Sequence, residues 1–232
     1  MQSFKEFLTK EEKFGDIKKL IGECNKTIVY DEKPDGLIIK NHIKLTNDTF
    51  FNVNLDHMPP GLLSCEGNFQ YALKYSNVSS ALTSCNNFPK YVGGDFWLEA
   101  RSVTDLRGCP ETVEGEECHI GGEFSSLEGI TRYVNNGQMT IKSPKLTSLQ
   151  NIHKHISFVE DRLDINAPIS SNILGLLKIR GVRTFGLEVR DYPQFYECNA
   201  AFGIVKKYVR SKDVFACQEE LIDAGLKDYA EL

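Results

Sequence analysis

Apolar residues recur through the middle of the chain with a period of about 22 residues. Segments that begin at Leu82, Val103, Phe124 and Leu146 can be aligned with one another, and a looser copy begins at Ile169. A period of about 20 to 50 residues is typical of solenoids, in which each repeat is too small to bury its own apolar face and stacks on its neighbours. The pattern therefore predicts a stack of repeats in place of one compact domain.

Within each repeat, two apolar columns are one residue apart, as in a strand whose alternate side chains point to opposite faces. These strand columns are Phe96, Cys118, Met139, Leu163, Phe185 and Leu98, Ile120, Ile141, Ile165, Leu187. Just before the strand stand Gly93-Gly94, Gly115 and Asn136-Gly137, which favour a turn with positive φ. Each repeat is thus predicted to start its strand at a tight corner.

The rest of each repeat is predicted to return on the opposite side as a short α- or 3₁₀-helical segment. Its apolar residues are three or four positions apart, which is helical spacing. They end in a column formed by Val92, Val113, Val134 and Ile156. We therefore predict one parallel sheet along one face of the stack.

The aligned segments 82–98, 103–120, 124–141 and 146–165 resemble the leucine-rich-repeat family. Their shared pattern, of the form LTSLxGxPxxVxGxFxL, also resembles repeat proteins of large, T-even-type tailed bacteriophages. Pattern and resemblance together predict an α+β fold: a single leucine-rich-repeat-like solenoid with short parallel strands on one face and helical caps at both ends. The resemblance further implies that a partner would be a host or viral protein.

Four parts of the chain are expected from this reading. They are an N-terminal helical cap or leader at 1–35, irregular N-terminal coils at 36–80, the repeat solenoid at 81–190 and a C-terminal helical cap at 191–232. Apolar residues at helical spacing predict amphipathic helices within residues 2–22, which would close the first coil. The opening MQSFKEFL also resembles internal head proteins of such phages, whose leader is removed after a Leu/Ile-x-Glu tripeptide. Ile21-Gly22-Glu23 fits that tripeptide, with the cut after Glu23.

At the other end, two helices are predicted, the second with Ser211 or Asp213 as its N-cap. We expect its apolar stripe to seal the last coil around Phe185 and Leu187, because an open end would expose unpaired strand edge. The stripe consists of Val214, Cys217, Leu221, Ile222, Leu226 and Tyr229.

Composition narrows the function classes. The net charge of -5 supplies no basic footprint for nucleic acid. No apolar run is long enough for a membrane span, and the first residues are charged where a signal peptide is apolar, so we expect a cytoplasmic protein. The seven cysteines include no CxxC pair, which favours reduced, buried thiols over disulfides or a zinc site.

No catalytic motif accompanies the repeats. GxSxG, GxxxxGK[ST], GxGxxG and HExxH are all absent from the sequence, so we expect no enzyme activity, no cofactor and no metal site. His153 and His155 are interpreted as exposed, unpaired side chains, and the acidic run 114–117 as a solvated corner.

A surface remains as the functional candidate. If the strand columns point inward, the residues between and beside them point outward and form ladders across the strands. The proposed partner-binding residues are Trp97, His119, Thr140, Arg162, Asp164, Glu99, Lys142 and Glu188. Trp97 is the only tryptophan, and it is either an interface residue or packed beneath the preceding coil against Tyr71.

The favoured function is non-catalytic protein binding through this face. Two alternatives stay open: an internal virion protein with a cleavable N-terminal leader, and an enzyme whose site lies where the sheet meets the C-terminal helices. The sequence sets neither the oligomeric state nor the identity of the partner.

Overall fold

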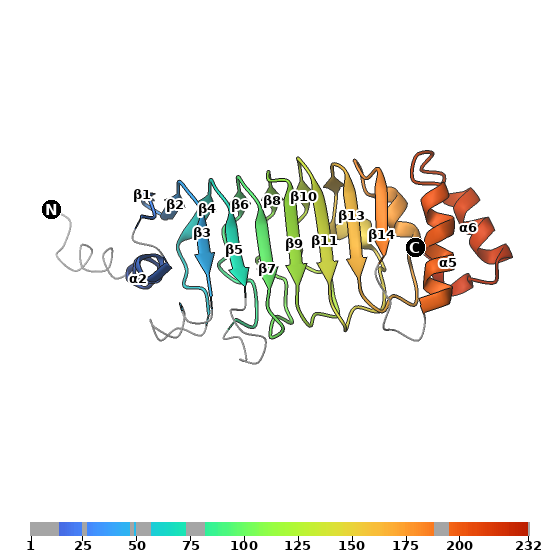
Figure 1. The fold of residues 1–232 in the computed structure, drawn as a ribbon, viewed down its shortest axis with the longest axis horizontal. Helices are drawn as coiled ribbons and strands as arrows, with labels where there is room; N and C mark the ends of the chain where they lie inside the picture. Colours follow the sequence, from blue (N-terminus) through green and yellow to red (C-terminus); the bar gives the residue numbers. More distant parts are fainter. Residues whose placement is uncertain are drawn as a thin grey trace.

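The computed structural model describes residues 14–24, 27–46, 49, 57–72, 82–187 and 195–231. These residues form an elongated parallel β-solenoid with helices at both ends (Figure 1). The predicted α+β solenoid is therefore confirmed, whereas its internal architecture differs from the prediction. Among the described helices, none is long and apolar enough to cross a bilayer.

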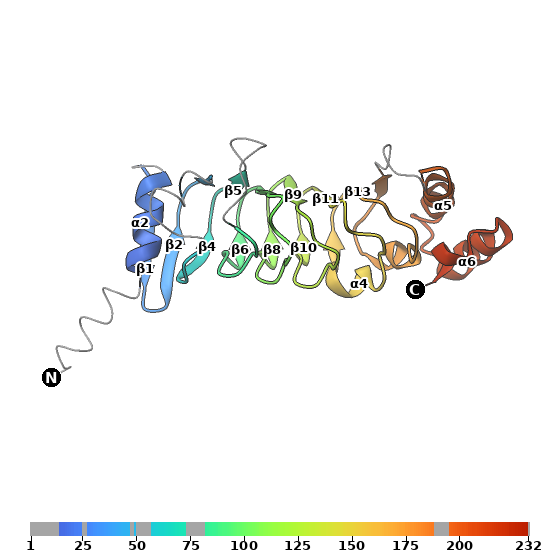
Figure 2. The ribbon, with the colours of Figure 1, turned by 90° about the horizontal axis from the view of Figure 1, so that it is seen from below.

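Two sheets of seven strands run along the solenoid and lie on opposite sides of its core (Figures 1 and 2). Sheet B has the longer strands: β3 (Ile43–Leu45), β5 (Phe69–Ala72), β7 (Phe96–Glu99), β9 (Glu117–Gly121), β11 (Gln138–Lys142), β13 (Arg162–Asn166) and β14 (Thr184–Leu187). Sheet A contains β1 (Tyr30–Lys33), β2 (Gly36–Ile39), β4 (Leu62–Cys65), β6 (Tyr91–Val92), β8 (Thr112–Val113), β10 (Tyr133–Val134) and β12 (Phe158–Val159). Neighbouring strands are parallel except for β1 and β2, which form an antiparallel hairpin at the N-terminal edge.

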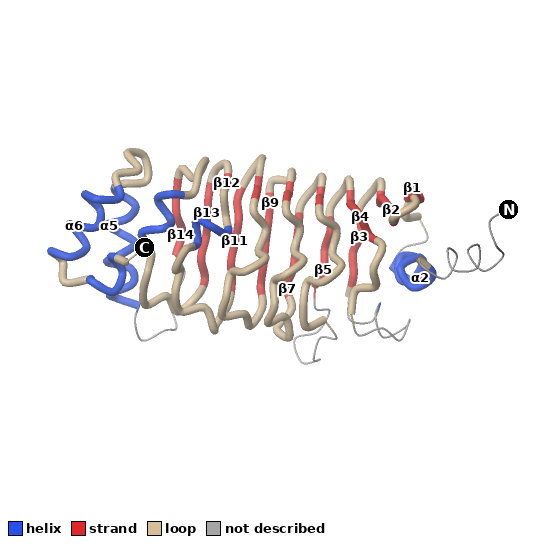
Figure 3. The backbone as a smooth tube through the Cα atoms, turned by 180° about the vertical axis from the view of Figure 1, so that it is seen from behind, coloured by secondary structure: helices blue, strands red, loops and turns tan. Residues whose placement is uncertain are grey.

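Sheet A occupies the place where helical returns were predicted, and that prediction is wrong for most coils. Between residues 82 and 187, helix is limited to α4 (Ile152–His155) and the 3₁₀ helix η1 (Leu174–Lys178) (Figure 3). The apolar residues three positions apart are instead joined by β-turns, in which Cys109 N donates to Leu106 O at 3.0 Å and Ile130 N to Leu127 O at 3.2 Å. A tight turn reverses the chain, so the side chains of its first and fourth residues both point into the core. Residues three apart on one face of a helix would have the same pattern.

The third residue of each of these turns has a positive φ, which asparagine and glycine adopt more readily than other residues. The four residues in this column are Asn87, Gly108, Gly129 and Asn151, with φ of 66°, 99°, 82° and 57°. Positive φ was expected at the other corner, at Gly93, Gly115 and Gly137, and is not found there.

The glycines at that other corner are needed for close packing between coils. A Cβ on Gly93 would lie 2.4 Å from the backbone oxygen of Glu66, and one on Gly137 would lie 2.0 Å from that of Glu116. Both distances are shorter than any tolerated contact, so a side chain would force neighbouring coils apart.

One apolar column was also misaligned. Val134 pairs with Val159, and Ile156 is the residue that ends α4. The short helix α4 lengthens this coil, so the residue in register with the valines lies three positions further along. Ile156 is still fully buried.

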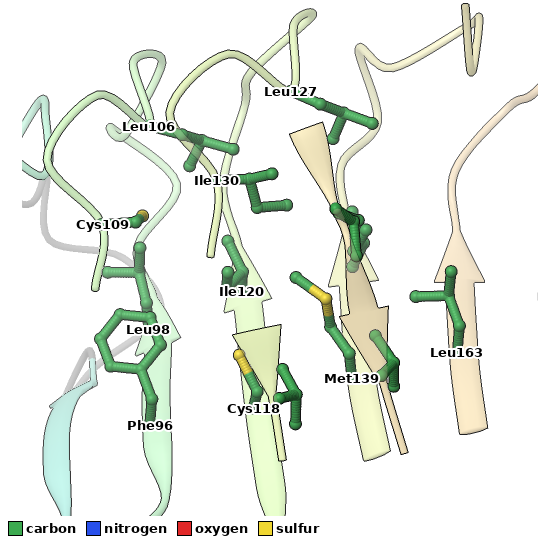
Figure 4. Packing of buried hydrophobic residues seen from close by; sticks show 14 of the residues in the cluster. Phe96, Leu98, Leu106, Cys109, Cys118, Ile120, Leu127, Ile130, Met139 and Leu163 are labelled. Carbon is green, nitrogen blue, oxygen red and sulfur yellow. The ribbon is translucent and has the colours of Figure 1, made fainter. Parts of the chain in front are cut away.

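The core is a continuous apolar column between the two sheets (Figure 4). Strand residues such as Phe96 and Met139 belong to the same buried cluster as the turn residues Leu106 and Ile130 (Figure 4). All seven cysteines are free thiols and six are buried, as expected. Burial raises the pKa of Cys118 to about 12, so this thiol remains protonated and packs as a small apolar group.

At the N-terminal end, α2 (Gly15–Cys24) covers the first coil. Ile17 and Leu20 are fully buried, Ile21 is 3% exposed, and the helix packs on β3. The predicted helix is confirmed for these residues, whereas residues 1–13 of the predicted segment lie outside the described part. Glu23 is exposed in the last turn of α2.

At the C-terminal end, α5 (Phe195–Lys207), α6 (Val214–Asp223) and the 3₁₀ helix η2 (Lys227–Ala230) close the solenoid (Figure 1). Asp213 is the N-cap of α6, because its carboxylate accepts from Ala216 N at 3.0 Å. Cys217, Leu221 and Tyr229 are buried as predicted. Ile222 is 42% exposed, because it lies about 100° around the helix from the buried Leu221.

Candidate functional site

The outer face of sheet B carries the predicted ladders in register. Trp97 is paired with His119, His119 with Thr140, Thr140 with Asp164, and Asp164 with Gly186. We call these five residues the central ladder. On one side of it, Glu99, Gly121, Lys142 and Asn166 are also in register, and on the other Arg162 is paired with Thr184. The structure thus places seven of the eight proposed binding residues on one face, while Glu188 lies outside the described residues.

Trp97 stacks on His119. Their ring centroids are 4.1 Å apart and the ring planes differ by 13°. Tyr71 is fully buried on the inner side of the sheet, so Trp97 does not pack against Tyr71, while residues 73–81 of the preceding coil lie outside the described part. The parallel strands hold the two rings at the spacing that offset stacking requires.

Glu99 connects three strands of the face. His119 Nε2 donates to Glu99 Oε2 at 2.6 Å, and Lys142 Nζ lies 3.3 Å from Glu99 Oε1. The hydrogen bond from His119 and the charge of Lys142 hold the pKa of Glu99 below its usual value, against the opposing effect of partial burial. Gly121 makes this reach possible, because a Cβ there would lie 2.5 Å from Glu99 Oε2.

A second ion pair lies toward the C-terminal end of the ladder. Arg162 Nε donates to Asp164 Oδ1 at 2.7 Å on strand β13. The pair extends over Gly186, where a Cβ would lie 1.7 Å from Asp164 Oδ1. Each ion pair of the face therefore lies over a glycine of the neighbouring strand.

Beside this second pair the face is hollowed into a groove of about 760 Å³, which we call the terminal groove. Its floor extends from β9 to β14, and Lys206 lines it from α5, the helix that lies beyond β14 in Figure 1. The polar side chains that line it are His119, Thr140, Lys142, Arg162, Asp164, Asn166, Thr184 and Lys206. The groove is open to solvent and its lining is mainly polar, so it can contact a ligand from one side.

Smaller hollows continue the groove along the face. One of about 370 Å³ is lined by Glu99, Arg101, Glu123 and Lys142, and one of about 180 Å³ lies beside Trp97 and His119. Lys142 therefore lies between the terminal groove and the first of these hollows. The face thus has a row of hollows lined by polar side chains between β7 and β14.

The other candidates from the sequence are His153, His155 and the acidic run 114–117. In the part of the chain that the structure describes, no three His, Cys, Asp or Glu side chains gather as metal ligands. His153 and His155 are half-buried, so their interpretation as exposed residues is wrong: Gly175 of the next coil approaches His153, and His155 lines a hollow with Gly129 and Arg132 of the preceding coil. Burial and the nearby Lys178 lower the pKa of His153. Glu114 in the acidic run accepts from Asn135 Nδ2 at 2.8 Å, and so joins neighbouring coils.

Sequence reasoning missed Lys206 as a residue of the face. The other lining residues belong to the repeat and follow from its register, whereas Lys206 lies in α5, outside the repeat. Its place beside β14 depends on how the cap docks, which no periodicity encodes. Comparison of the chain with protein-family models, with curated proteins and with solved structures finds no match.

Proposed function

We propose that the protein is a non-catalytic binding protein whose sheet B face recognises another protein. The observation that carries this proposal is the stacked Trp97–His119 pair beside a polar groove on a rigid parallel sheet. Tryptophan and arginine are the residues most often found at the energetic centre of protein interfaces, and solenoids commonly bind through such ladders. The proposed contact residues are Trp97, Glu99, His119, Thr140, Lys142, Arg162 and Asp164, together with Glu188.

The rigidity of the face supports binding. Its strands are paired on both sides from β5 to β13, and its charged side chains are held in ion pairs before any partner arrives. A preordered surface loses less conformational entropy on association than a flexible one. Binding through this face would therefore need little rearrangement.

The enzyme alternative places its site at the junction where the terminal groove is found. His119, which lines the groove, and Glu99, which lines the adjoining hollow, form one candidate acid–base pair, yet both carboxylate oxygens of Glu99 are already held, by His119 and by Lys142. Among the described residues, no serine or cysteine lines the groove. These contacts favour a binding surface over a nucleophilic centre.

The partner proposed from the resemblance to phage repeat proteins is a host or viral protein, met in the cytoplasm of the infected cell. The alternative of an internal virion protein requires cleavage after Glu23. That cut would remove α2 and with it the buried side chains of Ile17, Leu20 and Ile21. We therefore rank it below the binding proposal, and mass spectrometry of purified particles for a peptide beginning at Cys24 tests it.

Substitution on the face tests the binding proposal. Trp97→Ala and Arg162→Ala should each reduce recovery of a specific partner by at least about tenfold, as loss of a central interface side chain does. Recovery is measured by quantitative mass spectrometry of pull-downs from host lysate, and the captured partner is confirmed by a reciprocal pull-down.

Tyr91→Ala is the matched control. Tyr91 is a 40% exposed aromatic residue in sheet A, so this variant removes an aromatic side chain from the other face. Its partner recovery should equal that of the wild type. Equal recovery by wild type, Trp97→Ala and Arg162→Ala would overturn the proposal.

A further inference from the structure

The charges of the terminal groove identify the chemistry of its ligand. We propose that the groove binds an extended acidic segment of the partner protein, with Lys142, Arg162 and Lys206 as the charged contacts. This inference rests on the proposed function, and adds to it the class of segment that is recognised.

The groove has the opposite charge to the chain. Among the described residues that line it, Lys142, Arg162 and Lys206 supply three positive charges and Asp164 one negative charge, a surplus of two, whereas the whole chain carries -5. The adjoining hollow shares Lys142 and adds Arg101 against Glu99 and Glu123, so the described lining of the two together carries a surplus of one positive charge. Positive charge is thus concentrated over β11, β13 and α5. Complementary charge selects partners and suppresses wrong ones, which favours an acidic segment at this end of the face.

These cations retain hydrogen-bonding capacity. Lys206 is exposed and has no ion-pair partner among the described residues. Arg162 uses its Nε for Asp164, and a guanidinium has four further N–H donors. Lys142 shares Glu99 with His119 and is 49% exposed at its side chain. Each of these three side chains can therefore donate a hydrogen bond to a carboxylate of a ligand without breaking a buried contact.

The positions of the cations indicate an extended ligand. Lys142 ends β11 and Arg162 begins β13, so they lie on opposite sides of the central ladder, while Lys206 lies at the end. Parallel strands are about 4.8 Å apart, so the three steps from β9 to β14 span about 14 Å. An extended peptide rises about 3.3 Å per residue and would cover this distance with four or five residues. Its alternate side chains would point toward Lys142 on one side and Arg162 on the other.

This spread also argues against a single phosphate as the natural ligand. Lys142 is paired with Asn166, four residues along β13 from Arg162, so these two cations do not converge on one point. A longer polyanion such as a nucleic acid would also meet the acidic remainder of the chain. The acidic peptide is therefore the ligand that fits both the charges and the length.

Fluorescence anisotropy with labelled hexapeptides tests the inference on the full chain. A blocked hexaglutamate should bind at low ionic strength and lose affinity as salt rises, whereas hexaglutamine should not bind. Lys206→Glu should weaken hexaglutamate binding by at least about tenfold, and Lys206→Gln by less. Both changes are on an exposed helical position, so the fold should persist, which circular dichroism checks.

Arg210→Glu is the matched control. Arg210 is exposed in the same C-terminal cap but does not line the groove, and its reversal changes the net charge by the same amount. It should alter hexaglutamate affinity less than twofold, at the level of long-range electrostatics. Equal losses for Lys206→Glu and Arg210→Glu, or no binding of hexaglutamate to the wild type, would overturn the inference. So would tighter binding of hexathymidylate or of inorganic phosphate.

The pull-down separates this inference from the proposed function. If Trp97→Ala loses the partner and Lys206→Glu keeps it, the face binds a partner but the acidic-segment inference fails. If neither variant loses the partner, both proposals fail. If both lose it and Arg210→Glu does not, both are supported.

Discussion

Single glycines decide where charged side chains of the face can lie. Gly121 and Gly186 leave room for the carboxylates of Glu99 and Asp164 to extend over the neighbouring strand. Gly137 has a different role, because its missing side chain lets two coil backbones approach each other. One residue type thus shapes the candidate binding face in two places and sets the distance between coils in another.

Alanine at these positions should separate the two roles. In Gly137→Ala the new Cβ meets the backbone oxygen of Glu116, which cannot move alone, so we expect a loss of about 2–3 kcal/mol in the free energy of unfolding. In Gly186→Ala it meets the end of the Asp164 side chain, which can rotate, so the loss should stay below about 1 kcal/mol. Urea denaturation measures both. A larger loss for Gly186→Ala would contradict this difference between backbone and side-chain contacts.

His153 should make stability sensitive to mild acid. Burial lowers its pKa in the folded protein, so between that value and the unfolded value of about 6.5 the unfolded chain binds the proton more tightly. The contribution of neutral His153 is therefore complete above about pH 6.5 and is lost as the pH falls through the folded pKa.

His153→Gln removes this titration, so its unfolding free energy should fall less steeply between pH 7 and pH 5 than that of the wild type. Chemical denaturation at a series of pH values measures the slope. Parallel curves for wild type and His153→Gln would refute the assignment.

At the scale of elements, the period-2 columns predicted β7, β9, β11, β13 and β14 of sheet B and all of the ladder pairs that the structure describes. The return segments were mistaken for helices because an i, i+3 apolar pair has two structural sources, a helical turn and a β-turn. Asn87, Gly108, Gly129 and Asn151 carry the signal that separates them, since a column of asparagine and glycine indicates positive φ rather than a helix. Register follows from sequence, but the docking of α5 and the position of Lys206 do not.

Substitutions in the turn column should differ in cost. Asn151→Ala places alanine at a φ of 57°, and the expected loss is about 1 kcal/mol in the free energy of unfolding. Gly129→Ala adds a second penalty, because its Cβ would lie 2.4 Å from Arg107 Cα, so its loss should be at least about twice as large. Parallel urea titrations measure the two, and Asn151→Gly should be close to neutral. Equal losses for the two alanine variants would show that the coils relax at this corner.

At the scale of the molecule, the core of the solenoid is open at both ends of the stack, so its stability depends on the helices that cover them. Each coil packs only on its neighbours. An uncovered end of the stack would therefore expose apolar side chains and the unpaired backbone groups of the last strand. The helix α2 covers one end and α5 with α6 covers the other (Figure 1). The capping prediction is confirmed for the described helices.

Removal of residues 1–23 should destabilise the whole stack. Ile17, Leu20 and Ile21 would no longer be buried, at a cost of roughly 5 kcal/mol by apolar area, which is a large part of a typical domain's stability. We expect a lower melting temperature and association through the opened end, measured by calorimetry and size-exclusion chromatography. A monomeric variant with unchanged melting temperature would instead favour the leader alternative.

The helix α4 shows how the fold can vary in length without altering its binding face. It lengthens one coil on the side away from the central ladder, and yet Thr140 and Asp164 remain paired across β11 and β13. Insertions at this corner change the outline of the molecule and leave the spacing of the outward side chains intact. New sequence could therefore accumulate there, by evolution or by design, while recognition on the opposite side stays unchanged.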